Sequence, residues 1–263
     1  MKDYPFLCII VISGDYMEHR EYKRIIRNSD IAILFIHGIV GTPNHFNEFI
    51  SLVPEFISVY NMLLDGHGKG VKDFSKASMK KWESQVTSVV EELSLTHKEI
   101  YIVAHSMGTL LAMEQAIKNK KISKLFLVAV PLSLALKPKM PINSLKVYFD
   151  KIRLDDYEAL AAKKCYGIGK DRNPFRYIGW IPRFLELFKK ISQTRKIITL
   201  IDTECSVYQS GNDEMVSKRS IRYLENNPYI SVKILKSSGH YYYDKKDWDF
   251  LLSEFEKTVT MNT

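Results

Sequence analysis

The chain has 263 residues, of which 46% are hydrophobic and 26% are charged, and its net charge is +8. This length can bury one full core, and the composition excludes a disordered or low-complexity protein. A net positive charge without a recognition motif does not indicate nucleic-acid binding.

The chain opens with an apolar run, Phe6–Ile12, which is too short to cross a bilayer. Lys2 precedes it as in a signal peptide, but Asp3 and a poor cleavage pattern favour a first strand. We therefore expect two opening strands, residues 6–13 and 21–26, paired in a hairpin-like way across Gly14.

The rest of the chain alternates between continuous apolar runs and segments with helical spacing. The apolar runs predict strands at residues 31–36, 60–64, 99–104, 124–131, 205–210 and 230–236. The helical spacing predicts helices at residues 44–57, 78–94, 109–119, 155–165, 182–203, 217–226 and 245–259. Strands without polar alternation are buried on both faces, so the pattern predicts an α/β fold with a mostly parallel sheet between layers of helices.

The alternation breaks between the fourth and fifth of these strands. We divide the chain accordingly into a core at residues 1–133, an insertion at 134–182 and a second core segment at 183–263. Residues 134–183 contain eleven Lys or Arg and five Asp or Glu, so most of the positive excess lies there. This basic surface is either simply solvated or attracts anionic substrates or lipid surfaces.

A serine stands where the third of these buried strands turns into a helix. The stretch Glu99–Gly108 reads EIYIVAHSMG, and it ends in a small-x-Ser-x-Gly pattern with Ala104 in the first position and Ser106 in the middle. A serine on such a turn projects from the sheet, and the following helix directs free N–H groups and its positive dipole end toward it. Ser106 is our candidate nucleophile, although a serine here could also be a simple helix cap.

Two further polar residues follow other strands. Asp213 and His240 lie in turns after residues 205–210 and 230–236, so the chain order is Ser, Asp, His. Acyl transfer needs a base for the serine proton and a carboxylate that orients the base, and we assign these roles to His240 and Asp213. The backbone N–H groups of Ile39 and Met107 are the expected donors to an oxyanion.

Five stretches of the chain match the motifs of one family in order and spacing. They are FIHGIVGTPNHF (Phe35–Phe46), LLDGHGKGVKDFSKASMKKW (Leu63–Trp82), IVAHSMGTLLA (Ile102–Ala112), VYQSGNDEMVS (Val207–Ser217) and SSGHYYYDKKD (Ser237–Asp247). The chain thus resembles the α/β-hydrolase superfamily, and within it the bacterial carboxylesterases and monoacylglycerol lipases. The resemblance implies the same nucleophile, acid, base and oxyanion amides, and an insertion that caps the active site. Ala104 replaces a usual glycine, and Asp65 stands where the family often has proline.

The other histidines have less specific interpretations. We expect His105 to pack beneath the serine turn, His37 to hydrogen-bond within the oxyanion loop and His67 to shape its own loop. His19, His45 and His97 have no evident partner in the sequence. The tyrosines at 241–243 either line an acyl pocket or pack the last helix onto the sheet.

No metal-ligand spacing and no nucleotide-binding glycine pattern is present, so we expect no cofactor and no metal. The odd cysteines, Cys8, Cys165 and Cys205, lie far apart and do not indicate a disulfide framework, which predicts a cytoplasmic location.

The combined prediction is a serine hydrolase that cleaves carboxylic esters through an acyl-enzyme on Ser106. Its substrate would be a small-molecule ester, with acyl glycerols or anionic lipids as candidates, and we expect neither a nucleic-acid partner nor stable membrane insertion. A lysophospholipase or thioesterase is the alternative within enzymes, because a basic insertion suits a phosphate-bearing substrate. A non-catalytic binding protein on a hydrolase scaffold is the alternative outside them.

Overall fold

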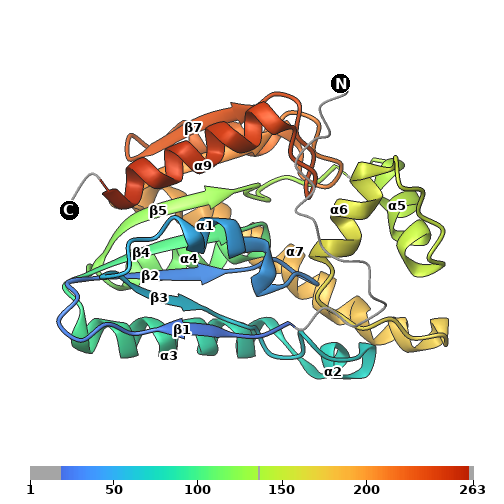
Figure 1. The fold of residues 1–263 in the computed structure, drawn as a ribbon, viewed down its shortest axis with the longest axis horizontal. Helices are drawn as coiled ribbons and strands as arrows, with labels where there is room; N and C mark the ends of the chain where they lie inside the picture. Colours follow the sequence, from blue (N-terminus) through green and yellow to red (C-terminus); the bar gives the residue numbers. More distant parts are fainter. Residues whose placement is uncertain (1–18, 136, 261–263) are drawn as a thin grey trace.

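A seven-stranded sheet forms the centre of the computed structural model, which describes residues 19–135 and 137–260 (Figure 1). The strand order is β1-β3-β2-β4-β5-β6-β7, and only the β1–β3 pairing is antiparallel. The strands are β1 (Tyr22–Arg24), β2 (Ile31–Ile36), β3 (Ser58–Asn61), β4 (Glu99–His105), β5 (Ile122–Val128), β6 (Glu204–Ser210) and β7 (Ile230–Leu235).

Helices cover both faces of this sheet. The α-helices are α1 (Asn47–Ser51), α2 (Val71–Lys76), α3 (Met79–Thr96), α4 (Met107–Lys118), α5 (Lys139–Tyr148), α6 (Tyr157–Cys165), α7 (Ile181–Ile197), α8 (Ile221–Leu224) and α9 (Lys245–Thr260). The short 3-10 helices are η1 (Pro43–Phe46), η2 (Pro174–Trp180), η3 (Ile198–Leu200) and η4 (Lys218–Ser220). Figure 1 shows α1 and α9 on one face and α3, α4 and α7 on the other.

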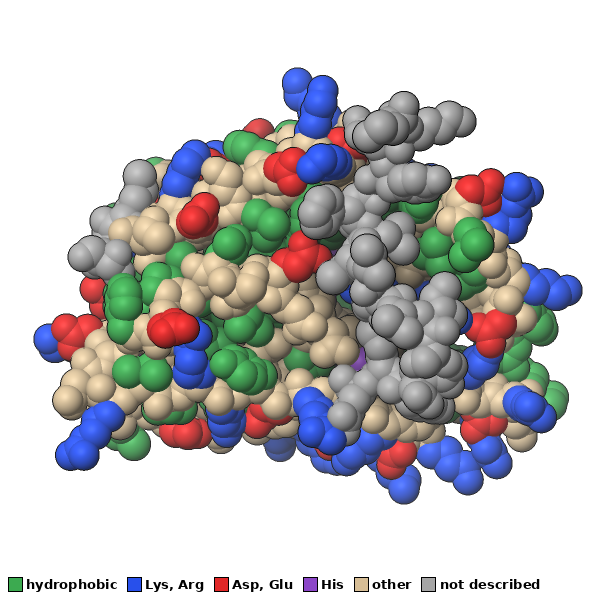
Figure 2. Space-filling view, viewed as in Figure 1, with side chains coloured by type: hydrophobic (Ala, Val, Ile, Leu, Met, Phe, Trp, Pro, Cys, Tyr) green, Lys and Arg blue, Asp and Glu red, His purple; other side chains and the backbone are tan. Residues whose placement is uncertain are grey.

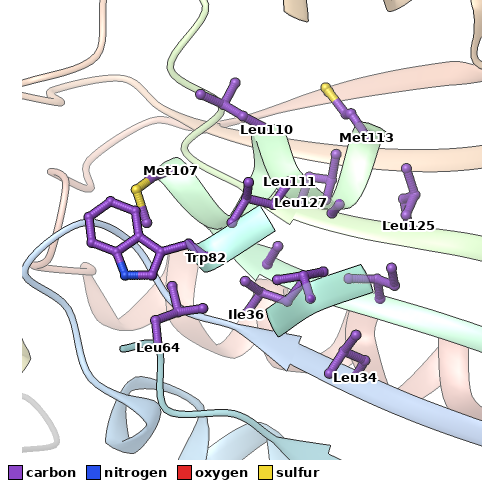
Figure 3. Close-up of a cluster of buried hydrophobic side chains, with 14 of the residues drawn as sticks. Leu34, Ile36, Leu64, Trp82, Met107, Leu110, Leu111, Met113, Leu125 and Leu127 are labelled. Carbon is purple, nitrogen blue, oxygen red and sulfur yellow. The ribbon is translucent and has the colours of Figure 1, made fainter. Parts of the chain in front are cut away.

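The alternation of side chains along the strands creates the two cores. In β2, Leu34 and Ile36 point into one cluster with the residues of α3 and α4, while Ile33 and Phe35 point into the other with α1 and α9. Every residue of β2 is buried, which explains its unbroken apolar sequence. Figure 3 shows the first cluster, where Trp82 of α3 lies near Met107 at the start of α4.

Several predicted elements need correction. The run at residues 6–13 lies outside the described residues, so its expected pairing with residues 21–26 stays a prediction. Within the described residues, β1 pairs antiparallel with β3. The helix expected at 44–57 is reduced to η1 and α1, because the chain turns out of the helix before Pro54. The helix expected to end near residue 203 stops at Leu200, so Asp202 is in a loop and pairs with Lys120.

The sequence pattern does not predict helices α2 and α5.

The insertion at residues 134–182 holds α5, α6 and η2, which lie beyond the carboxyl ends of the strands (Figure 1). Its basic side chains are largely neutralised within the same surface, where Figure 2 shows basic and acidic side chains beside one another. Six of the ten basic residues at 134–182 form ion pairs with acids of the insertion: Lys139, Lys146, Arg153, Lys163, Lys170 and Arg176. Among the described residues, no helix combines the length and the apolar character that a bilayer crossing requires.

A buried lysine attaches α7 to the core after the insertion. Lys190 is 4% exposed, and its ammonium group contacts the carboxylates of Glu83 on α3, at 2.7 Å, and Glu114 on α4. Both acids are partly exposed, at 33% and 20% of their side chains. The pairing therefore brings three helices together through one desolvated cation.

Replacing Lys190 with Ala should lower the free energy of unfolding by about 2–3 kcal/mol. Glu83 would lose this partner while it stays partly desolvated, and Glu114 would keep only its pair with Lys118. Urea unfolding followed by circular dichroism measures this. The matched control is Lys189→Ala at the neighbouring exposed position, which should change the stability by less than about 0.5 kcal/mol. Equal stability of the two variants would show that the pairing is not stabilising.

Candidate active site

Ser106 occupies the corner between β4 and α4 in a backbone conformation that side chains rarely adopt. Its φ is 52° and its ψ is −124°, and its own N–H donates to the carbonyl of Val128 at 2.9 Å. Such a conformation costs about 1–3 kcal/mol and persists only where the surrounding structure holds it. The sharp strand-to-helix turn that the sequence predicted is therefore present, with Ser106 at its tip.

Glycine at position 108 allows the corner to approach β2 closely. A Cβ atom at Gly108 would overlap the carbonyl oxygen of Ile36 and lie 2.8 Å from that of His37. A Cβ at Gly38 would lie 2.9 Å from the Cβ of Ser106. These two glycines bring the first turn of α4 against the loop that follows β2.

The two predicted oxyanion amides are both next to this contact. Ile39 lies in a turn that is closed by a hydrogen bond from the Gly41 N–H to the Gly38 carbonyl, at 3.1 Å. Met107 is the first residue of α4, where a helix leaves its N–H groups unpaired. Neither amide donates a hydrogen bond to another group in the part of the chain that the structure describes.

Asp213 and His240 form a buried, hydrogen-bonded pair. The Nδ1 of His240 is 2.9 Å from Oδ2 of Asp213, and the two side chains are 0% and 2% exposed. The other oxygen of Asp213 accepts bonds from the N–H groups of Met215 and Val216, at 2.8 and 2.7 Å. The side chain of Glu214 accepts a hydrogen bond from the backbone N–H of His240 at 3.0 Å. The turn that contains Asp213 therefore also binds the backbone of the loop that carries His240.

The two members of this pair shift each other's pKa in opposite directions. Burial opposes the charged form of each group, but the mutual attraction and hydrogen bond outweigh it. The pKa of His240 is therefore raised above its usual 6.5, and the pKa of Asp213 is lowered below 3.8. A carboxylate that orients an imidazole and stabilises its protonated form has these properties.

His105 connects the serine corner with the His240 loop. Its Nε2 lies 3.1 Å from the carbonyl oxygen of His240, and the two rings are 4.9 Å apart. The Nε2 of His240 is buried and makes no hydrogen bond, so no bond to Ser106 is formed within the described residues. The Nδ1 of His240 is therefore paired with Asp213, while its Nε2 is available for another partner.

The remaining histidines take structural positions, three of them with partners that the sequence did not reveal. His37 contacts the Gly38 carbonyl through Nδ1, at 2.9 Å, and accepts the Leu64 N–H, at 3.1 Å. His67 lies 4.6 Å from the His37 ring and contacts the backbone of its own loop. The newly found partners are Thr42 for His19, the His105 ring for His45 and Ser58 for His97.

The tyrosine run divides between two surroundings. Tyr241 lies against the His240 ring, with the centroids 4.7 Å apart, whereas Tyr243 packs on Trp248 of α9 at 5.1 Å. In the described residues, no three His, Cys, Asp or Glu side chains group as a metal site.

Comparison with known families agrees with this architecture. A family model described as the alpha/beta hydrolase family matches residues 33–247, which is most of the chain. The chain belongs to this alpha/beta hydrolase family. No curated protein matches the sequence at a significant level.

Solved structures with the same hydrolase fold share little sequence with it. One comes from work on the metagenome-derived lipolytic enzymes LipS and LipT, with a TM-score of 0.70, 14% identity, and coverage of 93% of this chain and 98% of that one. The monoacylglycerol lipase of Paleococcus ferrophilus has a TM-score of 0.63 and 16% identity, with 93% and 99% covered. An ancestral haloalkane dehalogenase also has a TM-score of 0.63 and 16% identity, with 92% and 94% covered. These likenesses establish the fold, and the chemistry must be argued from the residues.

The raised pKa of His240 can be measured directly. NMR titration of the imidazole should give a midpoint above 6.5, and Asp213→Asn should move it below 6.5, because the desolvation remains while the attraction is lost. The control is Asp202→Asn, which removes an exposed aspartate paired with Lys120 and should leave the midpoint unchanged. A midpoint unaffected by Asp213→Asn would contradict the pairing.

Proposed function

We propose that this protein is a serine hydrolase that cleaves carboxylic esters through an acyl-enzyme on Ser106. The observation that carries the proposal is the buried His240–Asp213 pair, whose unpaired Nε2 belongs to a loop joined by His105 to the strained serine corner. A base with a raised pKa, a serine on the adjoining corner and two free amides are the parts that acyl transfer requires.

In the proposed mechanism, the Ser106 oxygen attacks the ester carbonyl carbon while His240 Nε2 takes the hydroxyl proton. The amides of Ile39 and Met107 donate to the oxygen that becomes negative, and Asp213 stabilises the protonated imidazole. Collapse of this intermediate breaks the bond to the alcohol, which leaves with the proton from His240. Water then attacks the acyl-enzyme by the same steps, and the carboxylic acid is released.

The identity of the nucleophile favours esters over alkyl halides, although a haloalkane dehalogenase shares the fold. Displacement of a halide by Ser106 would produce an alkyl ether, which the His240–Asp213 pair has no route to hydrolyse. Attack on an acyl group produces a serine ester, which water cleaves with the same base and oxyanion donors. Multiple turnover with Ser106 therefore requires an acyl substrate.

We propose that residues 134–182 form the cap over this site. Lysophospholipids and thioesters remain alternative substrates, but ion pairs within the cap neutralise most of the basic side chains that favoured an anionic one. Exposed apolar side chains on α5 and η2, such as Leu145 and Phe175, are better suited to an apolar acyl chain. A pure binding protein is disfavoured, because binding alone does not need a strained serine corner joined to a buried His240–Asp213 pair.

Replacing Ser106 with Ala should reduce the hydrolysis of p-nitrophenyl butyrate by at least about a thousandfold, because no acyl-enzyme can form. The steady-state rate of p-nitrophenol release is the measurement. Labelling of the unmodified protein by a fluorophosphonate, followed by mass spectrometry, should place the adduct on Ser106. The control is Ser123→Ala, which changes a β5 serine that bonds to Glu99 and should retain full activity. Full activity of Ser106→Ala would exclude the proposed mechanism.

A further inference from the structure

The turn that holds the Ile39 amide contains a strained residue of its own. Val40 has a φ of 51°, in the left-handed region that is a rare and costly conformation for a β-branched side chain. Val40 is also 5% exposed, so the strain is located inside the molecule. The hydrogen bond from the Gly41 N–H to the Gly38 carbonyl closes this turn but does not itself require a positive φ at Val40.

A segment of the insertion holds the other side of this turn. Gly167 donates its N–H to the carbonyl of Val40 at 2.7 Å, and its own carbonyl accepts the N–H of Gly68 at 2.7 Å. Both polar groups of one glycine are thus used to connect two loops of the core. Two residues later, Gly169 donates to the Lys69 carbonyl at 2.8 Å, which extends the connection.

The fit at Gly167 excludes any side chain. A Cβ atom there would overlap the carbonyl oxygen of Gly41 and lie 3.2 Å from the Cβ of Thr42. The next residue, Ile168, is 8% exposed and belongs to the large apolar cluster, so the segment is anchored on both sides of the hydrogen bonds. Residues 166–169, which we call the brace, therefore pack directly on the backbone of the oxyanion turn.

We propose that the brace keeps the oxyanion turn in its strained, donor-presenting form, and that Gly167 is a positioning residue for the Ile39 amide. This inference rests on the proposed function. Loss of the bond from Gly167 removes a restraint on the Val40 carbonyl and favours relaxation of Val40 to a negative φ. That relaxation moves the adjoining backbone, including the Ile39 N–H. Because an oxyanion donor acts only at the correct place, a small displacement removes a large part of its effect.

The brace and a bound oxyanion stabilise each other. If the brace favours a turn that binds an oxyanion, an oxyanion bound in the turn must stabilise the brace by the same free energy. The insertion is then a part of the catalytic geometry in addition to a cover for it.

Gly167→Ala tests the positioning role. Its Cβ displaces the brace from Gly41, so kcat for p-nitrophenyl butyrate should fall at least tenfold while KM changes less than twofold. The matched control is Gly70→Ala in the adjoining loop, where φ is −83° and the nearest atom to a Cβ is 3.6 Å away; it should keep kcat within twofold. Thermal melting confirms that each variant is folded.

Rescue separates positioning from a general loss of structure. Adding Val40→Gly to Gly167→Ala should restore kcat at least fivefold, because glycine adopts the positive φ without strain. Wild-type kcat in folded Gly167→Ala, or no recovery in the double variant, would overturn the proposal. If Ser106→Ala is inactive while Gly167→Ala is fully active, the brace role alone is wrong; an active Ser106→Ala instead removes the proposed function.

A second measurement needs no variant in the brace. In fluorophosphonate labelling, the Ser106 oxygen bonds to phosphorus, its proton passes to His240 Nε2, and fluoride is expelled. A phosphoryl oxygen is then directed toward the oxyanion amides. Hydrogen exchange followed by NMR should then show the Gly167 N–H exchanging at least threefold more slowly in the labelled protein than in the free protein. An unchanged exchange rate at Gly167, with Ser106 fully labelled, would contradict the coupling.

Discussion

The geometry of the site depends on contact between backbones where two corners of the chain meet. Gly108 and Gly38 leave no space for side chains between the first turn of α4 and the loop after β2. This contact is possible because β2 and β4 are neighbours in the sheet, with Ile36 opposite Ala104. A larger residue at either glycine would separate the serine from the amide that the proposed mechanism uses, and no side-chain rearrangement could compensate.

The sheet order brings the proposed base, His240, toward the same edge of the sheet from the other side. The strands β6 and β7 are adjacent, and the turns that follow them carry Asp213 and His240. Two strands, β5 and β6, separate β7 from β4, so the His240 loop must reach back toward the serine corner. The contact between His105 and the His240 carbonyl connects the two loops, which gives the residue before the serine a role beyond packing.

Much of this arrangement could be predicted from local sequence. Strands buried on both faces appear as unbroken apolar runs, and α3 has a clear amphipathic stripe. Ser106, Asp213 and His240 each follow such a run, so the edge of the parallel sheet on which they meet was predictable. Helix α5 was missed because Ile142 and Leu145 are exposed, and no buried stripe marks it. His45 contacts His105, and Gly167 bonds to Val40, across long stretches of the chain. The local sequence around one residue of each pair does not indicate the other residue, so these contacts could not be predicted.

The cluster of buried histidines has a consequence for the whole molecule. Desolvation lowers the pKa of His37 to about 4 and of His45 to about 3, and it also lowers the pKa values of His67 and His105. In the unfolded chain these imidazoles would regain a pKa near 6.5. Below that pH they would bind protons that they do not bind in the native state. Below that pH, unfolding is therefore coupled to proton uptake, so acidification favours the open chain. The packing that keeps these rings uncharged near the serine therefore also lowers the stability of the folded protein in acid.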